Sequence, residues 1–168
     1  MKPIKLKELL RTAKDPATQK IAIAENYVLS VKTVFEGVVK DVPEYMLSKY
    51  YISDWYPEEE TPVLVVLVWV NPHEQFNKYA ENSNSDSHRF TIHDLMANGC
   101  CTNPYIDFAI VNIKTGEVLV DRVSDKTYTV DDNKDYDLFL PYEWKTVRAW
   151  EVRDGKMIFY ILPPKRRR

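Results

Sequence analysis

The chain has 168 residues, of which 45% are hydrophobic and 12% aromatic, so it can form one domain with a substantial core or two small ones. Its formal net charge is −2, and its only cysteines, Cys100 and Cys101, are adjacent, which excludes a disulfide framework. The stretch Leu9–Ala24 carries charged residues where a secretory signal would be apolar. We therefore expect a cytoplasmic protein without a membrane anchor.

The N-terminal stretch predicts an amphipathic helix over about Lys5–Lys14, where apolar residues recur at helical spacing with lysine and glutamate between them. The apolar positions are Ile4, Leu6, Leu9, Leu10 and Ala13. The apolar run Ile21–Ala24 is then followed by Glu25 and Asn26, which predicts a strand that turns into a second one through Tyr27–Val31. Residues 21–40 are thus expected to form a hairpin or two strands.

A strand followed by a helix is predicted next. The run Val34–Val38 favours a strand, and Gly37 within it tolerates a bulge or a close approach of the backbone. Pro43 suits the first position of a helix and holds the preceding residue in an extended conformation. We therefore expect the strand to end at Val42 and a short helix to cover about Pro43–Lys49.

Two further strands complete the first half of the chain. Tyr50–Tyr56 is aromatic and β-branched, and the acidic residues after Pro57 form a solvated turn. Val63–Val70 is apolar throughout and too short to span a membrane. It predicts a strand buried on both faces, or nearly so. A short helix is predicted at Glu74–Ala80, and the small polar residues Asn82–Ser87 form a linker.

Beyond this linker the order of elements restarts. The aligned segments are Phe90–Met96 with Ile4–Leu10, Val118–Asp125 with Val34–Asp41, Trp150 with Trp55, and Met157–Ile161 with Leu64–Val68. A strand at Tyr105–Ile113 and turns at residues 114–117 and 153–156 complete the second half. We therefore predict an α+β protein with two tandem related units, each a mainly antiparallel sheet with one or two helices. The alternative is a single α+β domain whose recurring hairpins mimic a duplication.

The predicted organisation has four parts. The first α+β unit covers residues 1–70, a short helix and polar linker cover 71–88, the second unit covers 89–163, and a basic tail covers 164–168. The second unit departs from the first at residues 126–143, where an acidic, tyrosine-containing segment is inserted.

One short pattern resembles a known group of proteins. A strand ending in Glu36-Gly37, followed by Asp41-Val42-Pro43-Glu44 at the start of a short helix and by two more strands, is similar to short α+β accessory proteins of phages and mobile elements of Gram-positive gut bacteria. Most proteins of this group have no assigned chemistry. The resemblance implies expression inside a bacterial host and a part in the conflict between element and host.

The sequence lacks the residue patterns of common catalytic sites. His88, His93 and the two cysteines lie close together, but vicinal cysteines do not have the spacing of a zinc site. The four glycines are scattered, which excludes a P-loop or a dinucleotide-binding fingerprint. We therefore expect no metal, no cofactor and no catalysis. A hydrolase acting through His93 or Cys100 remains a third-ranked alternative.

The charge is distributed unevenly along the chain. The basic first 20 residues and the tail Lys165, Arg166, Arg167 and Arg168 together carry +8, so the interior carries −10. A basic tail gives sequence-independent attraction to nucleic acid, which makes nucleic-acid binding through the termini the second hypothesis. The acidic interior argues against a duplex-binding face on the fold.

The favoured hypothesis is non-catalytic binding to another macromolecule, specifically to a host defence protein that the chain binds and inhibits. Aromatic side chains on strands alternate between the two faces of a sheet, and those left outward are typical interface anchors. The alternative is that these aromatic residues form the core and the seam between the two repeats. Acidic loops can imitate the phosphate backbone. The candidate partner-binding residues are Tyr51, Trp55, Tyr56, Glu58, Glu59, Glu60, Asp131, Asp132, Asp135 and Asp137. The pattern does not define the oligomeric state.

Overall fold

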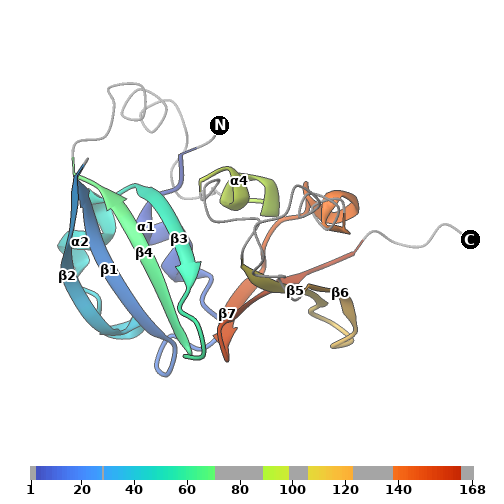
Figure 1. Ribbon diagram of the computed structural model, residues 1–168. Helices are drawn as coiled ribbons and strands as arrows, with labels where there is room; N and C mark the ends of the chain where they lie inside the picture. The colour runs from blue at the N-terminus through green and yellow to red at the C-terminus, as the bar shows by residue number, and fades with distance from the viewer. Residues whose placement is uncertain (1–2, 28, 71–88, 99–105, 123–137, 164–168) are drawn as a thin grey trace, which may run out of the picture.

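The computed structural model describes residues 3–27, 29–70, 89–98, 106–122 and 138–163 (Figure 1). Several predictions therefore lie outside the described residues. They are the helix at 74–80, the two cysteines, the acidic positions Asp131, Asp132, Asp135 and Asp137, and the tail Lys165–Arg168.

The first unit is a four-stranded sheet with two short helices and a turn of 3₁₀ helix. Its elements are α1 (Leu6–Arg11), β1 (Lys20–Tyr27), β2 (Ser30–Val38), η1 (Val39–Asp41), α2 (Glu44–Lys49), β3 (Ile52–Pro57) and β4 (Val63–Trp69). The strand order is β2-β1-β4-β3, in which the central pair β1 and β4 is parallel and the outer pairs are antiparallel. The helix α2 begins after Pro43, which lies at its N-cap in extended conformation.

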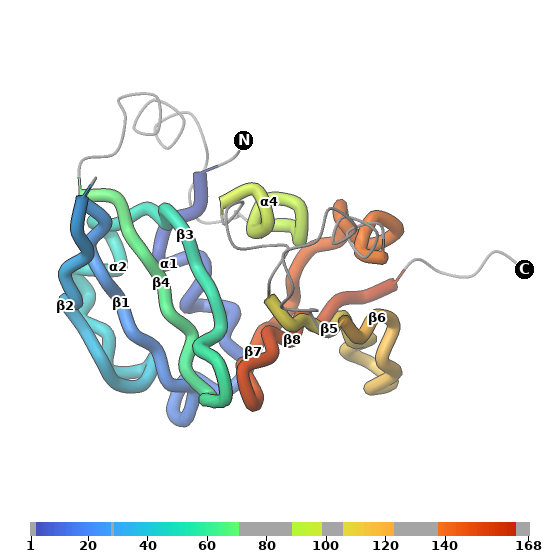
Figure 2. The backbone as a smooth tube through the Cα atoms, in the orientation of Figure 1, coloured from blue at the N-terminus to red at the C-terminus, as the bar shows by residue number. Residues whose placement is uncertain are grey.

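The second unit repeats this topology. Its described elements are α4 (Ile92–Ala97), β5 (Asp107–Asn112), β6 (Val118–Arg122), η4 (Leu140–Tyr142), β7 (Ala149–Arg153) and β8 (Lys156–Ile161). The order is β6-β5-β8-β7, with β5 and β8 parallel in the centre. Figure 2 shows the two sheets as separate bodies in the blue-to-green and yellow-to-red halves of the chain. The predicted α+β architecture of two related units is confirmed.

Hydrogen bonds show that the repeat extends to individual residues. Ile52 N, at the start of β3, donates to Ile4 O at 2.9 Å, and Val147 N, just before β7, donates to Phe90 O at 3.0 Å. The segment that precedes the first helix of each unit is therefore paired at the corresponding place in both units. The alignment of Phe90–Met96 with Ile4–Leu10 is thereby confirmed. A capping box at Thr91 adds a start signal to α4 that α1 lacks.

The predicted alignment of Val118–Asp125 with Val34–Asp41 is wrong by one residue. In the sheets, Ile23 pairs with Phe35 and its counterpart Ile110 pairs with Val120, so Phe35 corresponds to Val120 and not to Leu119. Both hairpins carry an irregularity at the same place, directly after these pairs. The apolar runs at the bulges fit either register, which is why the sequence did not distinguish them.

The core lies on the inner face of each sheet. On β4, buried residues Leu64, Val66 and Val68 alternate with partly exposed Val63, Val65 and Leu67. The prediction that Val63–Val70 is buried on both faces, or nearly so, therefore holds for the inner face only, because the outward residues are partly exposed and Trp69 is exposed. The helices α1 and α2 cover only the inner face of the first sheet and lie behind it in Figure 1.

Two tryptophans join the units through reciprocal hydrogen bonds. Trp55 Nε1 on β3 donates to Leu95 O of α4 at 2.7 Å, and Trp150 Nε1 on β7 donates to Leu9 O of α1 at 2.7 Å. Both indoles are completely buried. Because corresponding donors bond to corresponding acceptors in the opposite unit, the two units are related by an approximate twofold axis.

Candidate binding surface

The outer face of the first sheet lies opposite the helices. Strand residues alternate between the two faces, so the residues next to the buried core positions point outward. The register places them in three rows across β2, β1, β4 and β3: Val38, Lys20, Val63 and then Glu58; Glu36, Ala22, Val65 and Tyr56; Thr33, Ala24, Leu67 and Asp54. The two central strands thus present mainly apolar residues to the outside.

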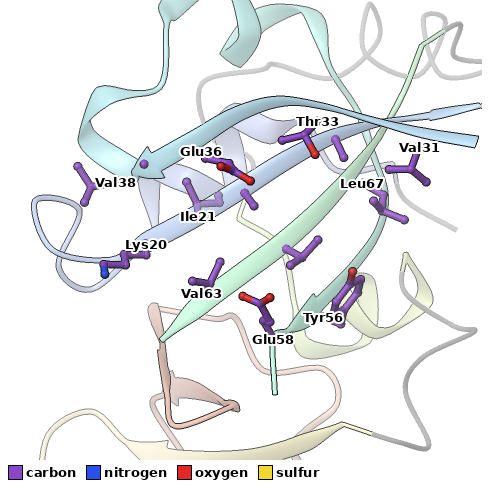
Figure 3. A pocket seen from close by; sticks show the side chains of 14 residues that line it. Lys20, Ile21, Val31, Thr33, Glu36, Val38, Tyr56, Glu58, Val63 and Leu67 are labelled. Carbon is purple, nitrogen blue, oxygen red and sulfur yellow. The ribbon is translucent and has the colours of Figure 1, made fainter. Parts of the chain in front are cut away.

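This face is hollowed along β1. The side chains of Ala22 and Ala24 are small, whereas Thr33 on β2 and Tyr56 and Leu67 beyond β1 are larger, so a depression of about 470 Å³ forms between them (Figure 3). We call this depression the first hollow; it is lined by residues of all four strands. Among the described elements, none forms a second layer over it.

Carboxylates flank the first hollow on both sides. Glu36 projects from β2, and Glu58 follows β3 on the other side, as Figure 3 shows. Glu58 is held in place because its N–H donates to Val63 O at 2.9 Å and its carboxylate accepts from Thr61 Oγ1 at 3.2 Å. Burial, with the neighbouring carboxylates of Glu58 and Asp54, raises the pKa of Tyr56, so this phenol stays neutral at physiological pH.

The second sheet has a corresponding hollow of about 530 Å³ with different chemistry. Ala109 and Ile158 occupy the positions of Ala22 and Val65, but charged residues extend onto this face. The ion pairs are Lys14–Glu151 at 3.4 Å, Arg153–Glu151 and Lys156–Asp121. The carboxylates of the second hollow are therefore neutralised within the chain.

The predicted partner-binding residues divide into three groups. Tyr56 and Glu58 line the first hollow. Glu59 and Glu60 lie in the β3–β4 turn, which packs against the β7–β8 turn: a Cβ at Gly155 would lie 2.8 Å from Glu60 N. The four aspartates at 131, 132, 135 and 137 lie outside the described residues.

Tyr51 and Trp55 are not surface anchors, and the expectation that they face outward is wrong. Trp55 is completely buried and Tyr51 is 5% exposed. Trp55 faces the interior because its indole N–H is bonded to α4 of the other unit. Tyr51 is covered by the N-terminal segment, since Lys5 pairs with it in a β-bridge and places its ammonium over the ring.

The residues that sequence reasoning missed are the small and aliphatic ones. Ala22, Ala24, Val65 and Leu67 line the first hollow. Large and small residues alternate in Ile21–Ala24, and this alternation could have indicated an outer face with small side chains. A strand with one packed face needs large side chains on that face only.

The outer strand edge of each sheet is disrupted by its irregularity. The register of β2 against β1 shifts after the Ile23–Phe35 pair, and that of β6 against β5 shifts after the Ile110–Val120 pair. Bulges on edge strands interrupt the regular row of backbone donors and acceptors and so disfavour the addition of another strand. The faces of the sheets are therefore better suited to binding than these edges.

The described residues do not bring metal-ligating side chains together. They contain no group of three or more histidine, cysteine, aspartate or glutamate side chains placed to hold a metal ion. His93 lies on α4 and is partly exposed. It stacks on Trp144 with ring centroids 4.2 Å apart, and its Nδ1 lies 3.6 Å from the Glu143 carboxylate. A search of the described helices for one of sufficient length and apolarity to cross a bilayer found none.

Comparison of the chain with protein-family models, with curated proteins and with solved structures found no match.

Proposed function

We propose that the protein is a non-catalytic binding protein that takes a partner protein on the outer face of its first sheet. The observation that carries this proposal is the first hollow, an apolar depression in the middle of the sheet with a carboxylate on each side. Apolar surface that gathers in one place on a soluble fold, with polar residues around it, is typical of an interaction site. Burying it against a partner removes it from water.

The nature of the partner follows from the sequence resemblance. Accessory proteins of phages and mobile elements act inside a bacterial host, so we propose a host protein as the partner and inhibition as the outcome of binding. Tyr56 is suited to an anchor role because its ring lies on the outer face while its hydroxyl can still bond to a partner.

The test compares two substitutions at corresponding positions of the two sheets. Val65→Arg places a cation in the first hollow, and Ile158→Arg places the same cation in the second hollow. Both proteins serve as bait in affinity capture from a lysate of Gram-positive gut bacteria, with circular dichroism melting curves as a control for folding.

We expect the captured host protein to be lost with Val65→Arg and retained with Ile158→Arg. Equal capture by the unaltered protein and by a folded Val65→Arg variant would contradict the proposed site.

A further inference from the structure

We propose that the first hollow receives an amphipathic α-helix of the partner, with basic residues on both sides of the helix's apolar stripe. This inference rests on the proposed function and specifies the chemistry of the partner.

The backbone chemistry of the face selects a helix over an extended segment. The N–H and C=O groups of β1 and β4 are used in pairing with strands on both sides, so the face offers a ligand side chains only. An extended peptide laid on apolar side chains would bury its own N–H and C=O groups without partners. A helix satisfies these groups internally, and the bulges described above disfavour binding at the β2 edge.

The dimensions of the hollow fit a single helix. Neighbouring strands are about 4.8 Å apart, so the distance from β2 across β1 to β4 is roughly 10 Å, which is the diameter of a helix with its side chains. On β4 the lining residues run from Val63 to Leu67, over about 13 Å, so about nine residues of a helix would lie in the hollow and a helix of about 15 residues would extend past its ends. The small side chains of Ala22 and Ala24 leave room for the helix to sit between the larger residues.

The charges on both flanks select a basic partner. Glu36 projects on the β2 side and Glu58 on the β3 side, and neither makes an ion pair with any described residue. Lys20, the one cation among the described residues that line the hollow, lies at the start of β1 in the same end row as Glu58, between the two flanks.

On the face of the second hollow, the carboxylates are neutralised by ion pairs within the chain. Asp121, which corresponds to Glu36, is paired with Lys156, and Glu151 is paired with both Lys14 and Arg153. Glu36 and Glu58 make no such ion pairs within the part of the chain that the structure describes, so a partner is free to supply the cations. Lysine and arginine suit this role because their aliphatic stems can lie along the apolar floor while their charged groups reach the flanks.

The experiment uses the full-length protein and three synthetic peptides of about 15 residues. The first has a leucine stripe flanked by lysines, the second has the same stripe flanked by glutamates, and the third is a scrambled version of the first. Binding is measured by fluorescence anisotropy of labelled peptide, and helix formation by circular dichroism of the mixture. Backbone NMR shifts of the unaltered protein locate the peptide without relying on any variant.

We expect the lysine-flanked peptide to bind as a helix, about tenfold or more tightly than the other two peptides. The largest shifts should fall at Ala22, Ala24, Val65 and Leu67. Val65→Arg should abolish binding and Ile158→Arg should leave it unchanged. Glu36→Gln and Glu58→Gln should each weaken it about threefold, as is usual for exposed ion pairs, with a weaker effect at high salt.

If a peptide binds, three results would still overturn the proposal. They are equal binding of the lysine-flanked and glutamate-flanked peptides, shifts confined to the second sheet, and a concentration-dependent dimer abolished by Val65→Arg, which would make a second copy the occupant. If no peptide binds while Val65→Arg still loses the captured host protein, the helix proposal fails and the proposed function stands. If a folded Val65→Arg variant loses nothing in either assay, both fail.

Discussion

Replacing Trp55 by phenylalanine should destabilise the whole protein, because this indole joins the two units. Trp55 is completely buried, donates its N–H to Leu95 O at 2.7 Å, and packs edge-on against Phe159 of the second sheet with ring centroids 6.0 Å apart. The smaller ring leaves a cavity and loses apolar contact worth about 2 to 3 kcal/mol. The lost hydrogen bond adds about 1 kcal/mol.

The expected total is therefore a loss of about 3 to 4 kcal/mol in the free energy of unfolding, a large fraction of the 5 to 15 kcal/mol typical of a domain. Urea unfolding followed by far-UV circular dichroism measures it. Trp144→Phe is the matched control: Trp144 is 66% exposed, so its loss should cost less than about 0.5 kcal/mol.

A second variant isolates the hydrogen bond. Benzothienylalanine at position 55 keeps the shape of the indole and lacks its N–H, so we expect a loss of about 1 to 2 kcal/mol. The corresponding change at Trp150 should cost less, because Leu9 O also accepts from Thr12 N at 3.2 Å and Thr12 Oγ1 at 2.8 Å. Trp55 does not join the two units as described if Trp55→Phe lowers the free energy of unfolding no more than Trp144→Phe does. Its hydrogen bond contributes nothing if the isostere leaves the free energy of unfolding unchanged.

Two further predictions concern the turns and the alkaline limit of stability. Gly155→Ala should destabilise more than Gly116→Ala in urea unfolding, since both glycines have φ near +75° but only at Gly155 would the new Cβ meet backbone, 2.8 Å from Glu60 N; equal losses would contradict this contact. Burial, reinforced by the nearby Glu25 carboxylate, raises the pKa of Tyr50 above its ordinary value of 10.0. The neutral phenol is thus favoured by folding, so its stabilisation is complete below about pH 10 and is lost as the pH rises through the raised pKa. Tyr50→Phe should make the fall in melting temperature above pH 10 shallower, and an unchanged pH profile would show that Tyr50 does not contribute to it.

Local patterns in the sequence determined the elements and their repetition. The apolar spacing of α1 and α4 aligns the two units at the correct residues, and the turn at Asp154-Gly155 lies where a hairpin was predicted. These features depend on residues close together in the chain. The alignment of β2 with β6 was one residue out because the apolar run at each bulge fits two registers, and only pairing with β1 and β5 selects one.

Tertiary structure decided which face of each strand is buried, and with it the candidate site. Alternation along β3 places Trp55 and Tyr56 on opposite faces of the sheet, but it does not determine which of the two faces packs against the core. Trp55 is inside because α4, some 40 residues later, supplies the acceptor for its indole N–H. The sequence of β1 alone likewise does not determine the first hollow. Its small residues stay uncovered only because the helices pack on the other face of the sheet. The sequence by itself thus defined two α+β units whose strands present alternate side chains to two faces. The packing of the helices and of one unit against the other buried one face of the first sheet and left its other face open.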